Sequence, residues 1–458
     1  MRGLRKPARI SEQRLSTSTP VPEKQAQSSE PMRRAVTAGT IGNFVEQFDF
    51  GIYGYLAPVM APVFFPSQNP VVGVLSTYAI LAIGTIIRPL GGMILGRWGD
   101  RFGRRSVLLW TIALMGLCTA LIGVLPTYEQ VGMLAPLLLL LMRMIQALIS
   151  GGEYVGAIAF VVEWAQPKRR AYYTSFVSIS VFVGILGGAG TSALTAVVFD
   201  DAALQSYGWR IPFLLALPLS LIGLWVRNRV GETPEFVKAT ADGADVVKAP
   251  LTEAFKSQWR EMLVFCGASI TLAIVSYTWV TYLPEFLSSN VGLSRAEALG
   301  SNAISVAVII PLLPLAGALS DRIGRRPMLI TGYLAALVLV PVAFWVAQMG
   351  TFTAAVIAQL IYVIPEFFLT GIVTVCVAEM FATKTRFSAG GVAYNSSFAL
   401  FSGITPFVSA LLVSTFGTIY AVWGYLAIAA VISLVVVIKW MEESYRLDLT
   451  TGKPMVQQ

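Results

Sequence analysis

Two nearly identical stretches of the chain decide its fold: "GRWGDRFGRR" at residues 96–105 and "GALSDRIGRR" at residues 317–326. The first copy starts at residue 96 and the second at residue 317, so they lie 221 residues apart. Each copy follows one long apolar run and precedes another. Gly, Asp and Arg with the same offsets at two such places indicate an internal duplication, and the apolar runs indicate what was duplicated.

The composition is that of a membrane protein. Of the 458 residues, 55% are hydrophobic and 13% are charged, whereas about 25% of an average soluble domain is charged. Twelve apolar runs reach the roughly 20 residues that a helix needs to cross a bilayer. We therefore predict an all-α polytopic membrane protein with twelve transmembrane helices. The runs lie near residues 36–62, 71–95, 106–125, 131–162, 172–199, 209–226, 261–288, 298–318, 327–346, 352–380, 389–415 and 418–440.

A long polar segment divides the twelve runs into two sets of six. The repeated motif follows the second run of each set, so the two sets are predicted to be duplicated six-helix halves related by an axis along the membrane normal. This is the architecture of parallel-repeat secondary transporters, which bind their substrate at the midplane between the halves. The first tail is rich in Ser, Thr, Pro and charge, which is typical of disorder. The predicted parts are a tail over 1–35, a first half over 36–226, a linker over 227–260, a second half over 261–440 and a tail over 441–458.

The basic residues predict the orientation of the chain. Most of its 33 Lys and Arg residues fall in the tails, the linker and the loops that share their side of the membrane. Cytoplasmic segments of membrane proteins carry such an excess, so both termini, the linker and the tails are expected to be cytoplasmic. The net charge of +8 then reflects topology, and no nucleic-acid partner is expected.

Several kinds of catalytic and metal chemistry are excluded by what the sequence lacks. It contains no histidine, and its three cysteines are scattered over the apolar runs without metal-ligand spacing. It also lacks a glycine-rich nucleotide loop. We therefore expect no enzyme, no metal and no cofactor, and any proton coupling must titrate a carboxylate.

A second repeat lies near the first. "VEWAQPKRR" at 162–170 and "AEMFATKTR" at 378–386 each place a Glu seven residues before an Arg. We expect the arginines of both repeats to pair with Glu163 and Glu379 and to latch the two halves on the cytoplasmic side. The alternative is that these arginines only set topology. The predicted cytoplasmic gate comprises Gly96, Asp100, Arg101, Arg104, Arg105, Glu163, Arg170, Asp321, Arg322, Arg325, Arg326, Glu379 and Arg386.

Ionisable residues inside the apolar runs are candidate functional residues, because a charge at mid-depth costs about 2.5–3.5 kcal/mol on insertion scales. Proton coupling is assigned to Asp49, Glu46 and Arg143. Two of these residues have an alternative to a role in the site. Arg88 could extend its side chain to the lipid headgroups, and Glu153 could join neighbouring helices. Glu285 and Glu366 are interpreted as interfacial residues at the outer ends of their runs. The candidate substrate-binding residues are Arg143, Gln146, Glu153, Tyr154, Tyr53, Arg88 and Tyr394.

The repeated "G-x-x-x-D-R-x-G-R-R" resembles the loop signature of the major facilitator superfamily. Further stretches resemble its metabolite:proton symporters, the bacterial transporters for 2-oxoglutarate, shikimate, citrate, aromatic acids and osmoprotectants. The chain departs from that group at Gln47, Ala147 and Tyr154, where Trp, Gly and Trp are usual. The matching stretches are "GNFVEQFDFGIYGYLAP" at 42–58, "RPLGG" at 88–92, "RMIQALISGGEY" at 143–154, "GWRIPF" at 208–213, "ETPEF" at 232–236 and "YN" at 394–395.

The resemblance implies a major facilitator fold in a bacterial cell membrane. It also implies alternating access driven by a proton gradient, a functional monomer and a substrate site at the midplane between the halves. It adds Asn395 to the substrate-binding residues, and it makes Asp49 with Arg143 similar to the protonation pair of proton-coupled sugar porters.

The fixed cations at Arg143 and Arg88 favour uptake of a small carboxylate-bearing organic acid. Two alternatives stay open: a proton-coupled exporter or antiporter, and a symporter of a zwitterionic osmoprotectant such as proline or betaine. Only about eighteen residues follow the last run, without heptads, so osmosensing through a C-terminal coiled coil is not expected.

Overall fold

The computed structural model describes residues 29–66, 70–233, 237, 250–382 and 385–445. Most of the predicted first tail, the middle of the predicted linker and the end of the last tail lie outside these residues. Every long element in the described part is a helix, and no strand occurs there. The prediction of an all-α protein is therefore confirmed.

The first half is built from six long helices that match the first six predicted runs. The short helices α4 (Tyr128–Val131) and α7 (Asp201–Ala203) and the turns η2 (Pro167–Arg169) and η3 (Leu204–Gly208) lie between them. The long helices are α1 (Ser29–Phe64), α2 (Pro70–Phe102), α3 (Arg104–Gly123), α5 (Leu134–Trp164), α6 (Arg170–Val198) and α8 (Arg210–Asn228).

The second half repeats this plan with two interrupted rods. The seventh rod of the chain is the first of this half. It consists of α11 (Trp259–Tyr277), the π-helical turn η4 (Thr278–Tyr282) and α12 (Leu283–Ser289). The short helix α10 (Pro250–Ser257) precedes it in the predicted linker. The remaining rods are α13 (Arg295–Ile323), α14 (Arg325–Ala347), α15 (Phe352–Glu379), α16 (Arg386–Phe401) with α17 (Thr405–Phe416), and α18 (Tyr420–Lys439).

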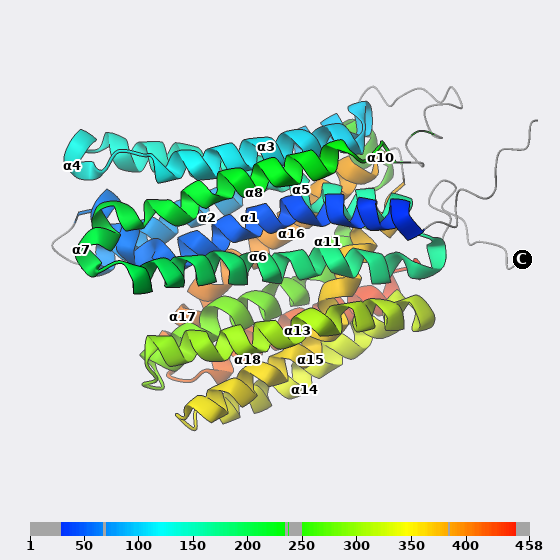
Figure 1. The fold of residues 1–458 in the computed structure, drawn as a ribbon. Coiled ribbons are helices and arrows are strands. Elements are labelled where there is room, and N and C mark those ends of the chain that lie inside the picture. The colour runs from blue at the N-terminus through cyan, green and yellow to red at the C-terminus, as the bar shows by residue number, and fades with distance from the viewer. Residues whose placement is uncertain (1–28, 67–69, 234–236, 238–249, 383–384, 446–458) are drawn as a thin grey trace, which may run out of the picture.

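Ten of the twelve helical rods have the length and mean hydropathy of membrane spans within the described residues. The other two, α1 and α2, are 36 and 33 residues long and lie alongside the rest of the bundle (Figure 1). Helices suit this environment because a helix satisfies its backbone hydrogen bonds internally, which a bilayer requires.

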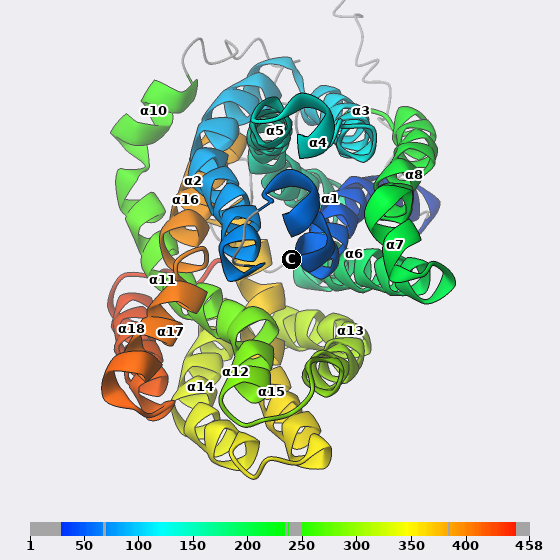
Figure 2. The same cartoon turned by 90° about the vertical axis from the view of Figure 1, so that its left-hand side faces the viewer.

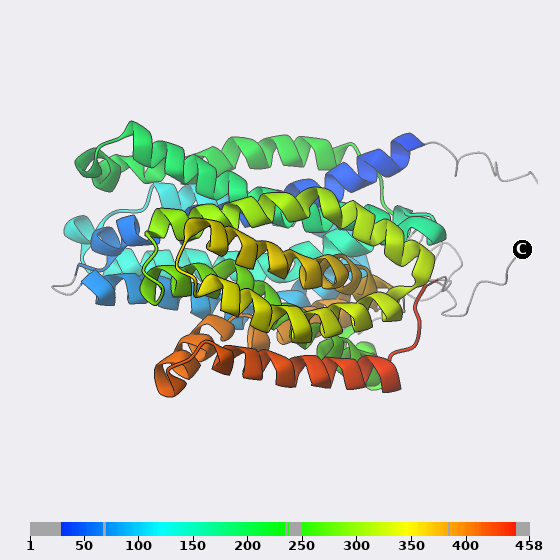
Figure 3. The same cartoon turned by 90° about the horizontal axis from the view of Figure 1, so that it is seen from below.

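The two halves lie side by side along the whole length of the bundle (Figure 1). Seen end-on in Figure 2, α2 lies against α16 on one flank and α6 lies against α13 on the other. The first described helix begins, and the last one ends, at the same end of the bundle (Figure 3). The predicted duplication therefore appears as two packed halves, and the charged repeats lie at the end where the described chain begins and ends.

Close helix contacts in the first half depend on glycine. A Cβ atom on Gly188 of α6 would lie 2.0 Å from the carbonyl oxygen of Phe48 in α1, and one on Gly51 would lie 2.3 Å from that of Ile185. Small residues of this kind let transmembrane helices approach backbone to backbone. The contact holds α1, which carries Glu46 and Asp49, firmly against α6.

Candidate functional site

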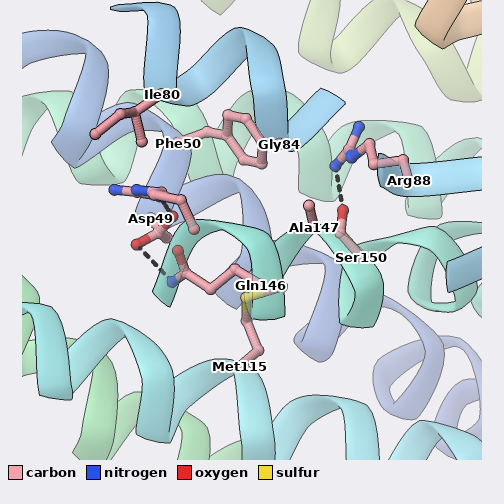
Figure 4. Close-up of a pocket in the computed structure, with 10 residues that line it drawn as sticks. Asp49, Phe50, Ile80, Gly84, Arg88, Met115, Gln146, Ala147 and Ser150 are labelled. Carbon is pink, nitrogen blue, oxygen red and sulfur yellow. Dashed lines mark hydrogen bonds and ion pairs between the residues drawn. The ribbon is translucent and has the colours of Figure 1, made fainter. Parts of the chain in front are cut away.

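A pocket among α1, α2, α3 and α5 brings together most of the predicted charged residues (Figure 4). All of its lining belongs to the first half, whereas the resemblance implied a site between the halves. The difference arises because three polar residues of α5, Arg143, Gln146 and Ser150, contact α1, α2 and α3 rather than the second half. The lining residues are Asp49, Phe50, Ile80, Gly84, Arg88, Met115, Arg143, Gln146, Ala147 and Ser150.

Asp49 is buried and forms an ion pair with Arg143. Gln146 reinforces the pair, since its Nε2 donates to Asp49 Oδ1 at 3.2 Å and to Thr119 at 2.8 Å. The guanidinium of Arg143 also lies 3.8 Å from the centre of the Tyr53 ring, within cation–π range. The structure thus brings together four of the residues predicted from the sequence.

A second carboxylate–arginine pair lies beside the first. Arg88 forms an ion pair with Glu46 and donates to Ser150, which in turn donates to Glu46. The Arg88 side chain is 18% exposed and lines the pocket (Figure 4). It therefore turns into the protein, and the alternative of snorkelling to the headgroups does not describe it.

Several buried polar atoms in or beside this pocket have no hydrogen-bond partner among the described residues. They are Nε and Nη2 of Arg143, Oε1 of Gln146 and Oε2 of Glu46. Buried polar groups in proteins are nearly always paired, so this cluster of unpaired atoms makes the pocket a candidate binding site. Nε and Nη2 form one edge of the guanidinium, which matches the two oxygens of a carboxylate.

Glu153 lies outside the pocket, which corrects its assignment to substrate binding. It forms an ion pair with Arg227 of α8 and accepts a hydrogen bond from Thr111 of α3. Arg227 was assigned to the linker but belongs to the last turn of α8. Glu153 therefore ties α5 to its neighbours within the first half, as the alternative reading held.

Tyr154, Tyr394 and Asn395 lie at the contact between the halves rather than on the lining of the pocket. Tyr154 forms a hydrogen bond of 2.9 Å with Thr374 of the second half, and its ring centre lies 5.0 Å from that of Tyr394. Asn395 Nδ2 donates to the carbonyl oxygen of Gly151 at 2.7 Å. These three residues therefore couple α5 to α15 and α16.

The sequence interpretation of Glu366 is wrong. It is the fifteenth of the 28 residues of α15 and is fully buried, so it does not lie at the outer end of that helix. Its oxygens accept hydrogen bonds from Ser276 at 2.6 Å and from Thr370. The error came from reading a long apolar run without knowing how much of it extends past the membrane on either side.

At the other end of α2, Asp100 binds the start of α16 in the second half. It accepts hydrogen bonds from the backbone N–H groups of Phe387 at 3.2 Å and Ser388 at 2.7 Å. Asp321 does the same for α6, accepting from Ala171 at 3.1 Å and Tyr172 at 2.8 Å. Each Asp therefore lies near the end of its own helix and caps a helix of the opposite half.

The repeated glycines explain how the halves approach here. A Cβ atom on Gly96 would lie 2.9 Å from Ser388 Cα, and one on Gly317 would lie 2.4 Å from the Ala171 carbonyl oxygen. Gly103 and Gly324, the last glycines of the two copies, have φ of 97° and 101°. That left-handed conformation favours glycine and turns the chain sharply into the next helix.

Two matched charge clusters surround these contacts. The first charge cluster comprises Asp100, Arg104, Glu163 and Arg386, and the second comprises Asp321, Arg325, Glu379 and Arg170. In the first, Glu163 lies 3.4 Å from Arg104 and 2.8 Å from Arg386. In the second, Glu379 lies 2.9 Å from Arg325 and 3.9 Å from Arg170. The structure therefore brings together most of the predicted gate, across both halves.

Arg101 and Arg322 are exposed and form no ion pair within the described residues, so they lie outside the charge clusters. Arg105 and Arg326 lie at the rim, where their side chains donate to the backbone carbonyls of Asn228 and Ile438, each at 2.9 Å. These four arginines fit the alternative that part of the basic charge serves topology.

The sequence analysis missed a third matched feature. Glu232 accepts from the N–H groups of Arg104 and Arg105, and Glu443 accepts from those of Arg325 and Arg326. Beside them, Thr233 donates to Glu163 at 2.6 Å and Ser444 donates to Glu379 at 2.9 Å. The short pairs Glu-Thr and Glu-Ser, each after the last helix of a half, were the signal available in the sequence.

The fold and the sites together define a class of protein. Two duplicated six-helix halves, a buried charged pocket and paired charge clusters between the halves are the architecture of a secondary transporter. Residues 39–394 match the family model of the Major Facilitator Superfamily. The chain belongs to this superfamily, and it is a multi-pass membrane transporter rather than an enzyme.

Curated relatives extend over almost the whole chain. The glycine betaine/proline/ectoine/pipecolic acid transporter of Dickeya dadantii is 35% identical over 434 residues, which cover 92% of this chain and 86% of the relative. The proline/betaine transporter of Escherichia coli K12 is 35% identical over 91% of this chain and 84% of its own. The ectoine/proline transporter of Corynebacterium glutamicum is 34% identical over 93% and 87%.

Solved structures agree on the fold. The proton:xylose symporter XylE superposes with a TM-score of 0.75 at 18% identity, over 91% of this chain and 97% of that one. The human organic anion transporter MFSD10 gives a TM-score of 0.66 at 17% identity, over 89% and 99%. At such identities the likeness shows the major facilitator fold and nothing about the substrate.

Proposed function

We propose that this protein is a proton-coupled symporter that takes up a zwitterionic osmoprotectant such as proline or betaine. The relatives from Dickeya, Escherichia and Corynebacterium are named for such compounds, each of which carries a carboxylate and a cationic nitrogen. Their names favour this alternative of the sequence analysis over a plain organic acid. The protein is proposed to act as a monomer in a bacterial cell membrane, with both termini cytoplasmic.

One observation carries the proposal: the pocket holds two arginines, each already paired with its own carboxylate. A substrate carboxylate at Arg143 competes with Asp49 for the same cation. Protonation of Asp49 removes that competition for the charge of Arg143. The substrate carboxylate then binds in two places at the Nε–Nη2 edge of Arg143, which is unpaired among the described residues. Proton and substrate then enter together, because the substrate carboxylate replaces ionised Asp49 as the partner of Arg143. No buried charge is left uncompensated when both are bound.

The charge clusters would control the conformational change that transport requires. They join the halves at the end of the bundle where the described chain begins and ends, the proposed cytoplasmic side. Rocking of the halves would separate the clusters and open the pocket to that side. No cofactor takes part in this scheme, and the proton gradient is the driving force.

Transport in proteoliposomes tests the proposal. With an acidic exterior, vesicles that contain the protein should accumulate radiolabelled proline or betaine, and a protonophore should abolish the accumulation. Expulsion of the same compounds by an inward proton gradient would instead establish the antiporter alternative. Accumulation of organic acids alone would instead support the first prediction from the sequence, uptake of a carboxylate-bearing organic acid.

The Asp49→Asn variant tests the coupling step. Asparagine resembles the protonated carboxyl group, so uphill accumulation should fall at least tenfold while exchange of internal for external substrate continues, since exchange needs no deprotonation. Both activities are measured in the same liposomes. Asp200→Asn, at an exposed residue outside the helices, is the matched control. If Asp49→Asn retains full accumulation, the coupling residue lies elsewhere and Glu46→Gln is the next variant.

A further inference from the structure

Glu366 differs from every other carboxylate buried within the helices of the bundle. Glu46, Asp49 and Glu153 of the first half each pair with an arginine. Glu366 is fully buried at the centre of α15 and forms no ion pair with any residue that the structure describes. Burying an unpaired charge is costly, so this side chain needs a cation or a proton from outside the protein.

The surroundings of Glu366 are arranged for an ionised carboxylate. Ser276 donates to Oε1 at 2.6 Å and Thr370 donates to Oε2. A carboxylate can accept several hydrogen bonds on its two oxygens, so the hydroxyl groups stabilise the charged form and still leave lone pairs on both oxygens. These contacts therefore suit Glu366 to bind a cation.

Glu366 lies on a polar stripe of α15 that reaches the first half at Thr374. Glu366, Thr370 and Thr374 are spaced four residues apart and so share one face of α15. Thr374 forms hydrogen bonds with Tyr154 at 2.9 Å and Ser178 at 3.1 Å, both in the first half. The stripe consequently leads from Glu366, which contacts Ser276 of α11, to the contact between the halves at Thr374.

Two comparisons of residue positions along α5 and α15 place Glu366 at the same depth in the bundle as the pocket. The helices α5 and α15 occupy matched places in the two halves and run in the same direction. Counting back 374 − 366 = 8 residues from Tyr154, the partner of Thr374, leads to Gln146. Counting back 379 − 366 = 13 residues from Glu163, the counterpart of Glu379, leads to Ser150. Both Gln146 and Ser150 line the pocket.

Aromatic rings border the contact between the halves at the level of Thr374, about two helical turns from Glu366. Tyr394 lies 5.0 Å from Tyr154 and 4.3 Å from Phe398, measured between ring centres. All three side chains are partly exposed. Aromatic faces attract organic cations, including quaternary ammonium groups that have no N–H to donate.

We infer that Glu366 binds the cationic nitrogen of a zwitterionic substrate whose carboxylate is held at Arg143. The inference rests on the proposed function and adds to it the residue that selects zwitterions. Each half of the protein then supplies one charge, and a solute with both charges bridges the halves. An anion without a cationic nitrogen meets the uncompensated charge of Glu366 and is rejected, which gives specificity by repulsion.

The test compares two solutes of nearly the same shape. Glycine betaine carries a trimethylammonium group, and 3,3-dimethylbutanoate carries a neutral tert-butyl group in its place. Both compete with radiolabelled proline for exchange in proteoliposomes. We expect betaine to compete at least tenfold better than its analogue with the unmodified protein, and this ratio to fall to about one with Glu366→Gln. Glu366→Asp, which keeps the charge, should keep most of the preference.

The matched control is Glu285→Gln, at an exposed glutamate of α12, which should leave the ratio unchanged. A Glu366→Gln protein with the original ratio would overturn the inference. So would a variant that loses only proton-driven accumulation and keeps the ratio, since Glu366 would then be a proton site. If proline is not exchanged by the unmodified protein, the proposed function itself fails, which is a separate result.

A measurement on the unmodified protein avoids dependence on the folding of a variant. A hydrophobic carbodiimide reacts with buried carboxyl groups, and mass spectrometry gives the extent of reaction at Glu366. Betaine should lower that reaction several-fold, whereas 3,3-dimethylbutanoate should not. Equal reaction in the presence of both compounds would contradict the inference.

Discussion

The two charge clusters contain the same residue types at matched positions, yet they join the halves differently. In the first charge cluster, Glu163 lies closer to Arg386 of the opposite half, at 2.8 Å, than to Arg104 of its own, at 3.4 Å. In the second, Glu379 accepts two hydrogen bonds of 2.9 Å from Arg325 of its own half, while Arg170 of the opposite half lies 3.9 Å away. Duplication therefore copied the residues without copying the strength of their contacts.

The aspartates show the opposite behaviour, because their contacts are equal in the two clusters. Asp100 and Asp321 each accept two backbone hydrogen bonds from the start of a helix in the other half, all between 2.7 and 3.2 Å. A carboxylate at a helix N-terminus is stabilised by the helix dipole. The hydrogen bonds from Asp side chains to backbone N–H groups therefore hold the halves symmetrically, whereas the ion pairs between side chains hold them asymmetrically.

The largest expected effect comes from breaking the stronger side-chain link. Glu163→Gln removes the charge shared by Arg104 and Arg386, and loss of one partner from a buried pair costs about 3–5 kcal/mol. The cost falls on the closed state, since these arginines would meet water once the halves separate. We expect the open population to rise at least tenfold more than with Glu379→Gln, whose main contact stays within its own half.

Alkylation of Val155→Cys measures that population. Val155 is buried and lies against Gly390 of the opposite half, so a cysteine there reacts only when the halves separate. The background protein has its three native cysteines replaced by serine. Equal alkylation with Glu163→Gln and Glu379→Gln would show that the difference between the two clusters has no consequence for opening.

An intermediate effect is expected from the aspartates. Asp100→Asn and Asp321→Asn each weaken a cap on a helix of the other half, and a favourable partly buried charge there is worth up to about 2 kcal/mol. Because the contacts match, the two variants should open to the same extent in the Val155→Cys assay and slow proline exchange equally. A severalfold difference between them would extend the asymmetry to the backbone contacts.

The smallest effect is expected from Arg101→Ala and Arg322→Ala. These side chains are exposed, and exposed charges contribute about 1 kcal/mol or less. Alkylation and exchange should both stay within about twofold of the unmodified protein. A loss of transport comparable to that of Asp100→Asn would mean that these arginines form contacts in the open state.

Much of the fold could be predicted from the sequence. The twelve apolar runs match the twelve helical rods, because both the length of a span and its hydropathy are set locally by the bilayer. Two of the rods are nevertheless interrupted, at η4 and between α16 and α17. The break between α16 and α17 falls at Ser402 and Gly403, just before Pro406, and η4 precedes Pro284. Gly and Pro are local helix-breaking signals, but hydropathy averaged over a span does not register them.

The candidate site was predicted in part. The spacing of Glu46, Asp49 and Arg143 within apolar runs was enough to select them, since a charge in a span is conspicuous wherever it points. The partners of Glu153 and the burial of Glu366 were not predictable. Each depends on which face of a helix meets which neighbour, and a run that is apolar on every side carries no such signal.

The sequence by itself determined that this chain is a duplicated membrane transporter, because composition, run length and repeated motifs act through local chemistry. The tertiary structure decided which charges meet. It directed Asp100 and Asp321 to helices of the opposite half, linked Glu163 across the interface more tightly than Glu379, and left Glu366 without a cation among the described residues. The physical reason is that a buried ion pair depends on distances of a few ångströms between helices, and these are set only when both halves pack together.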